Sequence, residues 1–205
     1  MRRRAVLLYA LACLAVAGAA GAQPRSDPDW PCVQRKVPAI TAGAVWSGPD
    51  VTLALNDWSK DAEAAALAQK LASRRTPIGE ADRMIDEFAR DKGPEKAERL
   101  TRVFAGVLDL INTERDRILH GIERYARGQR QLADRIRDEG DQISAIKDSP
   151  TATETKELHE LESRFAWDKR IFEERRQSLA FVCETPVLLE QRVFEIARHI
   201  QERLS

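Results

Sequence analysis

The sequence PEKAERLTRVFAGVLDLINTERDRILHGIERYARGQRQLADRIRDEGDQISAIKD at residues 94–148 decides the fold, because no proline interrupts it after Pro94. Its apolar residues recur at steps of three and four, which is the spacing of one face of an α-helix. An additional step of four near Gly121 makes this a heptad pattern with a stutter, as in coiled coils. The positions on this seam are Leu100, Phe104, Val107, Ile111, Glu114, Ile118, Ile122, Tyr125, Gln129, Leu132, Ile136, Glu139, Ile143 and Ile146.

A second helix of similar pattern follows the turn at Ser149-Pro150. Thr151 and Glu154 are spaced as a capping box at its start. We expect helix over 151–183, and a kink or restart at Thr185-Pro186 before a last helix over 185–204. The short loop implies antiparallel neighbours, so residues whose numbers sum to about 300 should lie side by side. The expected seam positions are Leu158, Leu161, Phe165, Asp168, Phe172, Arg175, Leu179 and Val182.

Two shorter helices are expected before the long one, over about 57–74 and 77–91. Pro77 suits the first turn of the second of them, whose apolar residues share one face. Residues 23–56 contain seven prolines and glycines, so they should form an extended arm.

The expected fold is therefore all-α: a long antiparallel, coiled-coil-like helical hairpin, with two shorter helices packed at its base and an extended N-terminal arm. The helical domain would cover residues 57–205. A compact four- or five-helix bundle with a break near Gly121 is the alternative.

The N-terminus has the layout of a secretory signal peptide. Arg2 to Arg4 precede an apolar run, and Ala20-Gly21-Ala22 is a small-x-small cleavage pattern. We expect residues 1–22 to be removed and the mature chain to be periplasmic or secreted, with no membrane span. A retained anchor helix and acylation at Cys13 are the alternatives.

After such cleavage two cysteines remain, Cys32 and Cys183. An even pair in an exported chain favours one disulfide, which would fix the arm to the helical body. Two buried free thiols are the alternative. A redox site is less favoured, because the sequence has no C-x-x-C motif.

Charge and composition exclude some partners. Charged residues make up 32% of the chain with equal numbers of each sign, and removing residues 1–22 takes away three arginines and no acid. No basic excess is present to bind nucleic acid, and no polybasic block indicates a membrane surface. A protein partner is expected, and a homo-oligomer is open because seam positions left exposed would suit a second copy.

The sequence offers no catalytic constellation. Nucleophile-elbow, phosphate-loop and dinucleotide-binding motifs are absent, so we expect no enzyme, no catalytic residue and no cofactor. His120, His159 and His199 lack metal-ligand spacing, and no metal site is expected. Trp30 and Trp46 on the arm are candidate interaction residues, because aromatic residues are frequent in binding hot spots. The alternative is that they attach the arm to the helices.

Three stretches carry a resemblance. The motif D-W-P-C-x-Q-x-K-V-P (Asp29 to Pro38), W-S-G-P (Trp46 to Pro49) and FAGVLDLINTER (Phe104 to Arg115) resemble an uncharacterised exported family of alphaproteobacteria. The resemblance spans most of the mature chain and implies a periplasmic location. It implies no activity, so no functional residue follows from it.

The function expected from these patterns is that of a periplasmic helical interaction or scaffold protein. A ligand- or metal-binding accessory protein and a holdase-type periplasmic chaperone are the alternatives.

Overall fold

The computed structural model describes residues 27, 29–90, 93–149 and 155–204. The expected signal peptide at 1–22 and the expected capping box of Thr151 and Glu154 lie outside these residues. The start of the second long helix that the structure does describe is capped by Thr155, whose hydroxyl accepts a hydrogen bond from the Leu158 amide.

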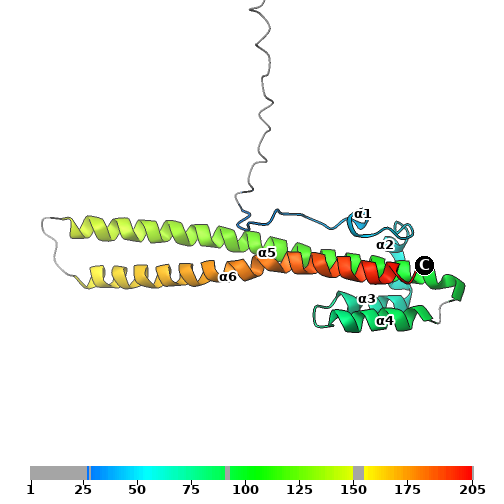
Figure 1. Ribbon diagram of the computed structural model, residues 1–205. Coiled ribbons are helices and arrows are strands. Elements are labelled where there is room, and N and C mark those ends of the chain that lie inside the picture. The colour runs from blue at the N-terminus through cyan, green and yellow to red at the C-terminus, as the bar shows by residue number, and fades with distance from the viewer. Residues whose placement is uncertain (1–26, 28, 91–92, 150–154, 205) are drawn as a thin grey trace, which may run out of the picture.

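Two long antiparallel helices form the hairpin, α5 (Lys96–Lys147) and α6 (Lys156–Gln201). Figure 1 shows them side by side, with the last residues of α5 and the first residues of α6 at the same end of the hairpin. Helices α3 (Ala62–Ala72) and α4 (Ile78–Arg90) pack against the other end. The described residues contain no strand, and the all-α hairpin with two shorter helices is confirmed over the compact bundle.

The arm runs over the side of the hairpin opposite α3 and α4 (Figure 1). It contains a short helix, α1 (Ala42–Val45), and leads into α2 (Ala54–Asp57) and a 3₁₀ turn at Trp58–Lys60. A second 3₁₀ turn at Gly93–Glu95 precedes α5. The hairpin therefore has a base, where all these elements meet, and a projecting two-helix stalk, defined here as residues 115–147 and 156–186.

Two expected boundaries were wrong. The helix predicted from residue 57 begins at Ala62, because the Asp61 side chain caps it by accepting from the Ala64 amide at 3.1 Å. The restart expected at Thr185-Pro186 is absent, because α6 is one helix through Pro186. Proline removes one helical hydrogen bond, but this proline is buried, so tertiary packing on both sides of it holds the helix.

The expected seam is right over most of its length, but it is wrong where the stalk begins and at Ile146 and Arg175, which are exposed. Glu114 is exposed, and Arg115 is the buried residue instead, with 2% of its surface exposed. On α6, Val182 is exposed and Cys183 is buried. On each helix the buried position is thus one residue later than predicted, at the level where Arg115 and Cys183 contact the arm.

The register of the hairpin agrees with the expected sum of about 300. The Tyr125 hydroxyl donates to the Arg175 carbonyl at 2.7 Å, and the Gln129 amide donates to the Phe172 carbonyl at 3.1 Å. Nearer the base, Arg115 Nε donates to the Pro186 carbonyl at 3.4 Å. Side chains on α5 thus bond to the backbone of α6 along the stalk.

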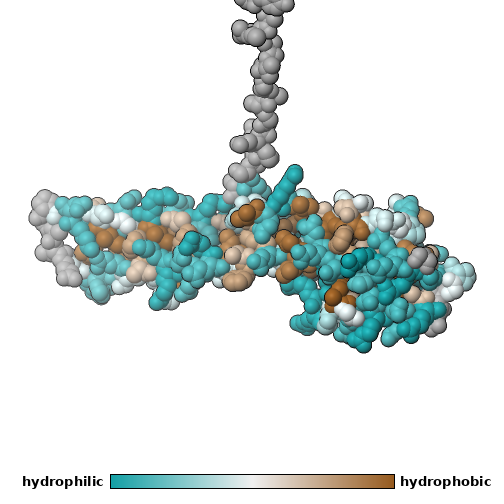
Figure 2. Space-filling model, in the orientation of Figure 1, coloured by the Kyte–Doolittle hydropathy of each residue, from teal (hydrophilic) through white to brown (hydrophobic). Residues whose placement is uncertain are grey.

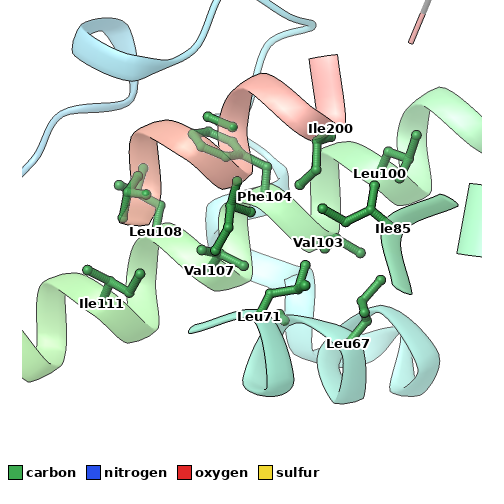
Figure 3. Packing of buried hydrophobic residues seen from close by; sticks show 14 of the residues in the cluster. Leu67, Leu71, Ile85, Leu100, Val103, Phe104, Val107, Leu108, Ile111 and Ile200 are labelled. Carbon is green, nitrogen blue, oxygen red and sulfur yellow. The ribbon is translucent and has the colours of Figure 1, made fainter. Parts of the chain in front are cut away.

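The hydrophobic core lies in the base. Side chains from α3, α4, α5 and α6 converge there, as Figure 3 shows for Leu71, Ile85, Phe104 and Ile200. These four residues have no more than trace exposure. Because the core is confined to the base, the stalk is held together mainly by its two-helix seam.

Gly106 on α5 permits the closest contact in the base. A Cβ placed there would lie 2.7 Å from the Trp58 ring and 2.8 Å from the Ala68 Cβ. The 3₁₀ turn and α3 can therefore approach α5 only at a glycine.

We predict that Gly106→Ala lowers the free energy of unfolding by about 1–3 kcal/mol, since overpacking a filled core is destabilising. Gly128→Ala on the same helix is the matched control, because no atom lies within 4 Å of its added Cβ. That control should raise stability by roughly 0.5–1 kcal/mol. Urea unfolding of both variants checks this, and equal effects would contradict the close contact.

A half-buried ion pair joins the start of α3 to α5. Arg99 donates two hydrogen bonds to the Asp61 carboxylate, at 2.7 and 2.8 Å. The guanidinium lowers the pKa of Asp61 to about 2, and the Ala64 amide contributes to the shift.

We predict that Asp61→Asn, which keeps the cap, lowers stability by about 2 kcal/mol at neutral pH. Because the folded pKa lies below the unfolded one, this contribution is present above about pH 4 and is lost as the pH falls toward 2. Urea unfolding from pH 3 to 7 measures it. Asp141→Asn, at an exposed site on α5, is the control. If the difference in unfolding free energy between wild type and Asp61→Asn grew as the pH falls, the stabilising ion pair would be contradicted.

Candidate interaction surface on the stalk

The arm is fixed to the hairpin by a disulfide. Cys32 and Cys183 are bonded with their Cα atoms 5.6 Å apart, 151 residues apart in sequence, as the cysteine count predicted. The bond joins the arm to α6 where the stalk leaves the base. The first part of the arm is thereby held at mid-hairpin.

Ion pairs hold the same part of the arm on α5. Asp29 accepts from Arg127 at 2.8 Å and also from Arg130, and these guanidinium groups lower the pKa of Asp29. Lys36 binds Glu123, and this contact raises the pKa of Lys36. The arm thus lies along α5 from the level of residue 130 toward the base.

Farther along, polar and aromatic contacts continue the attachment. The Asn112 side chain both accepts from the Ile40 amide and donates to the Ile40 carbonyl, at 2.9 Å each. Trp46 stacks on Phe104 with ring centroids 4.1 Å apart, and its N–H donates to the Pro49 carbonyl. Trp30 is half-buried and donates to the Gln34 carbonyl at 2.6 Å. The structure does not bring the two tryptophans together: Trp46 packs on the core of the base, whereas the hydrogen bond of Trp30 lies within the arm.

Polar side chains are buried in the seam of the stalk. Arg115 donates to the Val37 carbonyl of the arm at 3.2 Å, and its burial lowers the pKa of its guanidinium. Near the far end, Arg135 binds the buried Asp168, and buried Glu139 lies close enough to raise the pKa of Arg135. Buried polar groups in a coiled coil fix its register at a cost in stability.

One side of α6 is covered by α4 in the base. Arg192 donates to the Leu71 and Thr76 carbonyls, His199 Nδ1 lies 2.9 Å from Asp82 Oδ1, and Arg203 Nη2 lies 2.7 Å from the same atom. Helix α4 therefore runs parallel to α6 along this face. His199, considered from sequence only as the neighbour of Glu195, is part of this helix contact.

The same face continues along the stalk with large apolar side chains in the open. Trp167, Phe181 and Leu188 are 54%, 74% and 50% exposed. Together with Glu174 they are spaced at seven residues, so all four share one helical face that we call the outer stripe. Phe181 precedes the buried Cys183 by two residues and therefore projects from nearly the opposite side of α6.

Charges accompany the outer stripe. Arg170 lies over the Trp167 ring, with its guanidinium carbon 4.4 Å from the ring centroid. Arg170 and Glu174 are both exposed. In Figure 2 the visible face of the stalk is largely hydrophilic, with hydrophobic residues in a band between the two helices.

The sequence interpretation missed the outer stripe. Its signal was present as exact seven-residue spacing from Trp167 to Leu188. The pattern that faces α5 is longer and contains more apolar residues, and it masks this second spacing in the sequence.

Pockets, metal-ligand clusters and membrane-spanning helices are the other features that bear on function among the described residues. Two hollows of about 260 and 370 Å³ open on the base, the first lined by Gln69, Arg74 and Glu114 among others, and the second by Asp50, Asp57 and Arg102 among others. No group of three or more potential metal ligands occurs among the described residues. None of the described helices is long and apolar enough to cross a membrane.

Compared with known proteins, the chain matches no family model, no curated protein and no solved structure. The resemblance carried by Asp29 to Pro38 therefore stays a prediction.

The disulfide generates a prediction about the arm. Replacing both Cys32 and Cys183 by serine should lower the free energy of unfolding by roughly 3–5 kcal/mol, because the bond closes a long loop in the unfolded chain. Amide hydrogen exchange at residues 32–38 should also become faster, since the ion pairs alone are partly exposed. Reduced wild-type protein is the control and should behave as the variant does. An unchanged unfolding midpoint would contradict a stabilising role for the bond.

Proposed function

We propose that the protein is an exported helical interaction protein whose stalk binds a protein partner along the outer stripe. Export to the periplasm or the outside rests on the signal-like sequence at 1–22. The Cys32–Cys183 bond supports it, because disulfides persist in oxidising compartments.

The observation that carries the proposal is the exposure of Trp167, Phe181 and Leu188 on one face. Scattered apolar residues on a surface need no explanation, but a line of large ones does. Tryptophan and arginine are among the residues most frequent in binding hot spots, and here Arg170 lies directly over Trp167.

The rest of the structure suits a binding arm. Trp167 to Leu188 span about 30 Å along the helix at 1.5 Å per residue. The hydrogen bonds between α5 and α6, and the attached arm, hold this line of side chains in place before a partner arrives. A preformed surface loses less conformational entropy on binding, which favours affinity.

The shape of the surface indicates the shape of the partner. In the base, the same face of α6 is occupied by a helix, α4. Apolar residues spaced at seven are typical of a face on which another helix packs. Because α4 packs on this face in the base, a partner helix could pack on it along the stalk. The proposed partner segment is therefore helical.

A photo-crosslinking amino acid at Phe181 tests the proposal in the periplasm of the host. We expect an adduct at this position, because its side chain is the most exposed on the outer stripe. Phe194 is the matched control, since it is a phenylalanine on the same helix, 54% exposed and off the stripe. Adducts at neither position, or equally at both, would contradict binding along the stripe.

A further inference from the structure

We propose that the helix bound on the outer stripe is α6 of a second copy of this chain, packed antiparallel. This inference rests on the proposed function and names its partner. It follows from three features of the stripe: where it ends, which orientation fits beside it, and which charges it carries.

The turn between α3 and α4 limits the stripe on the base side. Arg192 bonds to Leu71 and Thr76, which places this turn beside α6 at residue 192. A helix lying on the stripe must therefore end before that level. At the other end, α6 itself begins at Lys156.

The orientation follows from α4. In a parallel pair, both α4 helices would lie at the same level between the two α6 helices and hold them apart. In an antiparallel pair, each base lies beyond the tip of the other stalk. If Lys156 of one copy stops near Leu188 of the other, the two-fold axis passes α6 near residue 172.

The side chains near that axis are complementary to themselves. Arg170 of each copy faces Glu174 of the other, because their numbers sum to 344, the same as 156 and 188. Within one helical turn, Trp167 of each copy reaches Phe181 of the other. A two-fold interface requires this kind of self-complementary patch.

Such pairing also removes apolar surface from water. The two-fold symmetry would produce the Trp167–Phe181 contact twice in the dimer. Aromatic side chains contribute much of the binding energy of interfaces. Each stalk, with buried Arg115, Glu139 and Asp168 in its own seam, would gain a second seam on its outer side.

Sedimentation equilibrium of the full mature chain, with its disulfide intact, tests the pairing. We expect a reversible dimer. Phe181→Glu should raise the dimer dissociation constant at least about thirtyfold, while Phe194→Glu should change it less than about twofold. A monomer up to about 100 µM, or a dimer unaffected by Phe181→Glu, would overturn the proposal.

Complementary charge variants test the register. Arg170→Glu and Glu174→Arg should each weaken the homodimer by roughly tenfold, because each places like charges opposite each other twice. Mixing the two variants should restore dimers of wild-type affinity, and the mixing leaves the charges within each chain unchanged. Failure of the mixture to recover would overturn the register.

The two proposals fail separately. A monomeric chain that still crosslinks at Phe181 to a protein of different mass would overturn self-pairing and retain the proposed function. An adduct with twice the mass of the chain would support both. A monomeric chain that forms no adduct at Phe181 would overturn both the proposed function and self-pairing.

Discussion

The packing of α5 against α6 is the constraint on which the rest of the structure depends. It places Phe104 and Ile200 in one core at the base, and without it α3 and α4 would have no surface to cover. In the stalk, the same packing is fixed by specific bonds from Tyr125, Gln129 and Arg115 to the backbone of α6. These bonds can form in only one register of the two helices. The outer face of α6 therefore has one fixed orientation relative to α5.

The two sides of α6 in the stalk differ in which polar and apolar side chains they carry. Its inner side in the stalk contacts a seam that includes Glu139 and Asp168, whereas its outer side carries Trp167 and Phe181. Burying charge adds little stability on balance, and it is better explained by the selection of one register. The exposed apolar side chains on the outer side are the surface that the proposed partner would cover.

Much of the fold could be predicted from sequence, because helical periodicity and turn residues are local signals. The hairpin, its register, the two short helices and the Cys32–Cys183 pair follow from them. The buried Arg115 could not be predicted, since the carbonyls that accept from its Nε and Nη2 belong to Pro186 and Val37, which are distant in sequence. The continuity of α6 through Pro186 likewise depends on packing. The outer stripe was visible as spacing, but only the structure distinguishes an exposed seam from a buried one.

The most direct test of the account is the dipolar distance between two spin labels, one on each copy of the chain. Each label is attached to one added free cysteine, Glu160→Cys, with the native disulfide intact. Residue 160 lies near the tip of the stalk, and its copy would face the level of residue 184. Antiparallel pairing predicts about 40 Å between the two labels, from the rise of an α-helix and the spacing of packed helices. A distance under about 20 Å, which a parallel pair would give, or the absence of any dipolar signal, would contradict it.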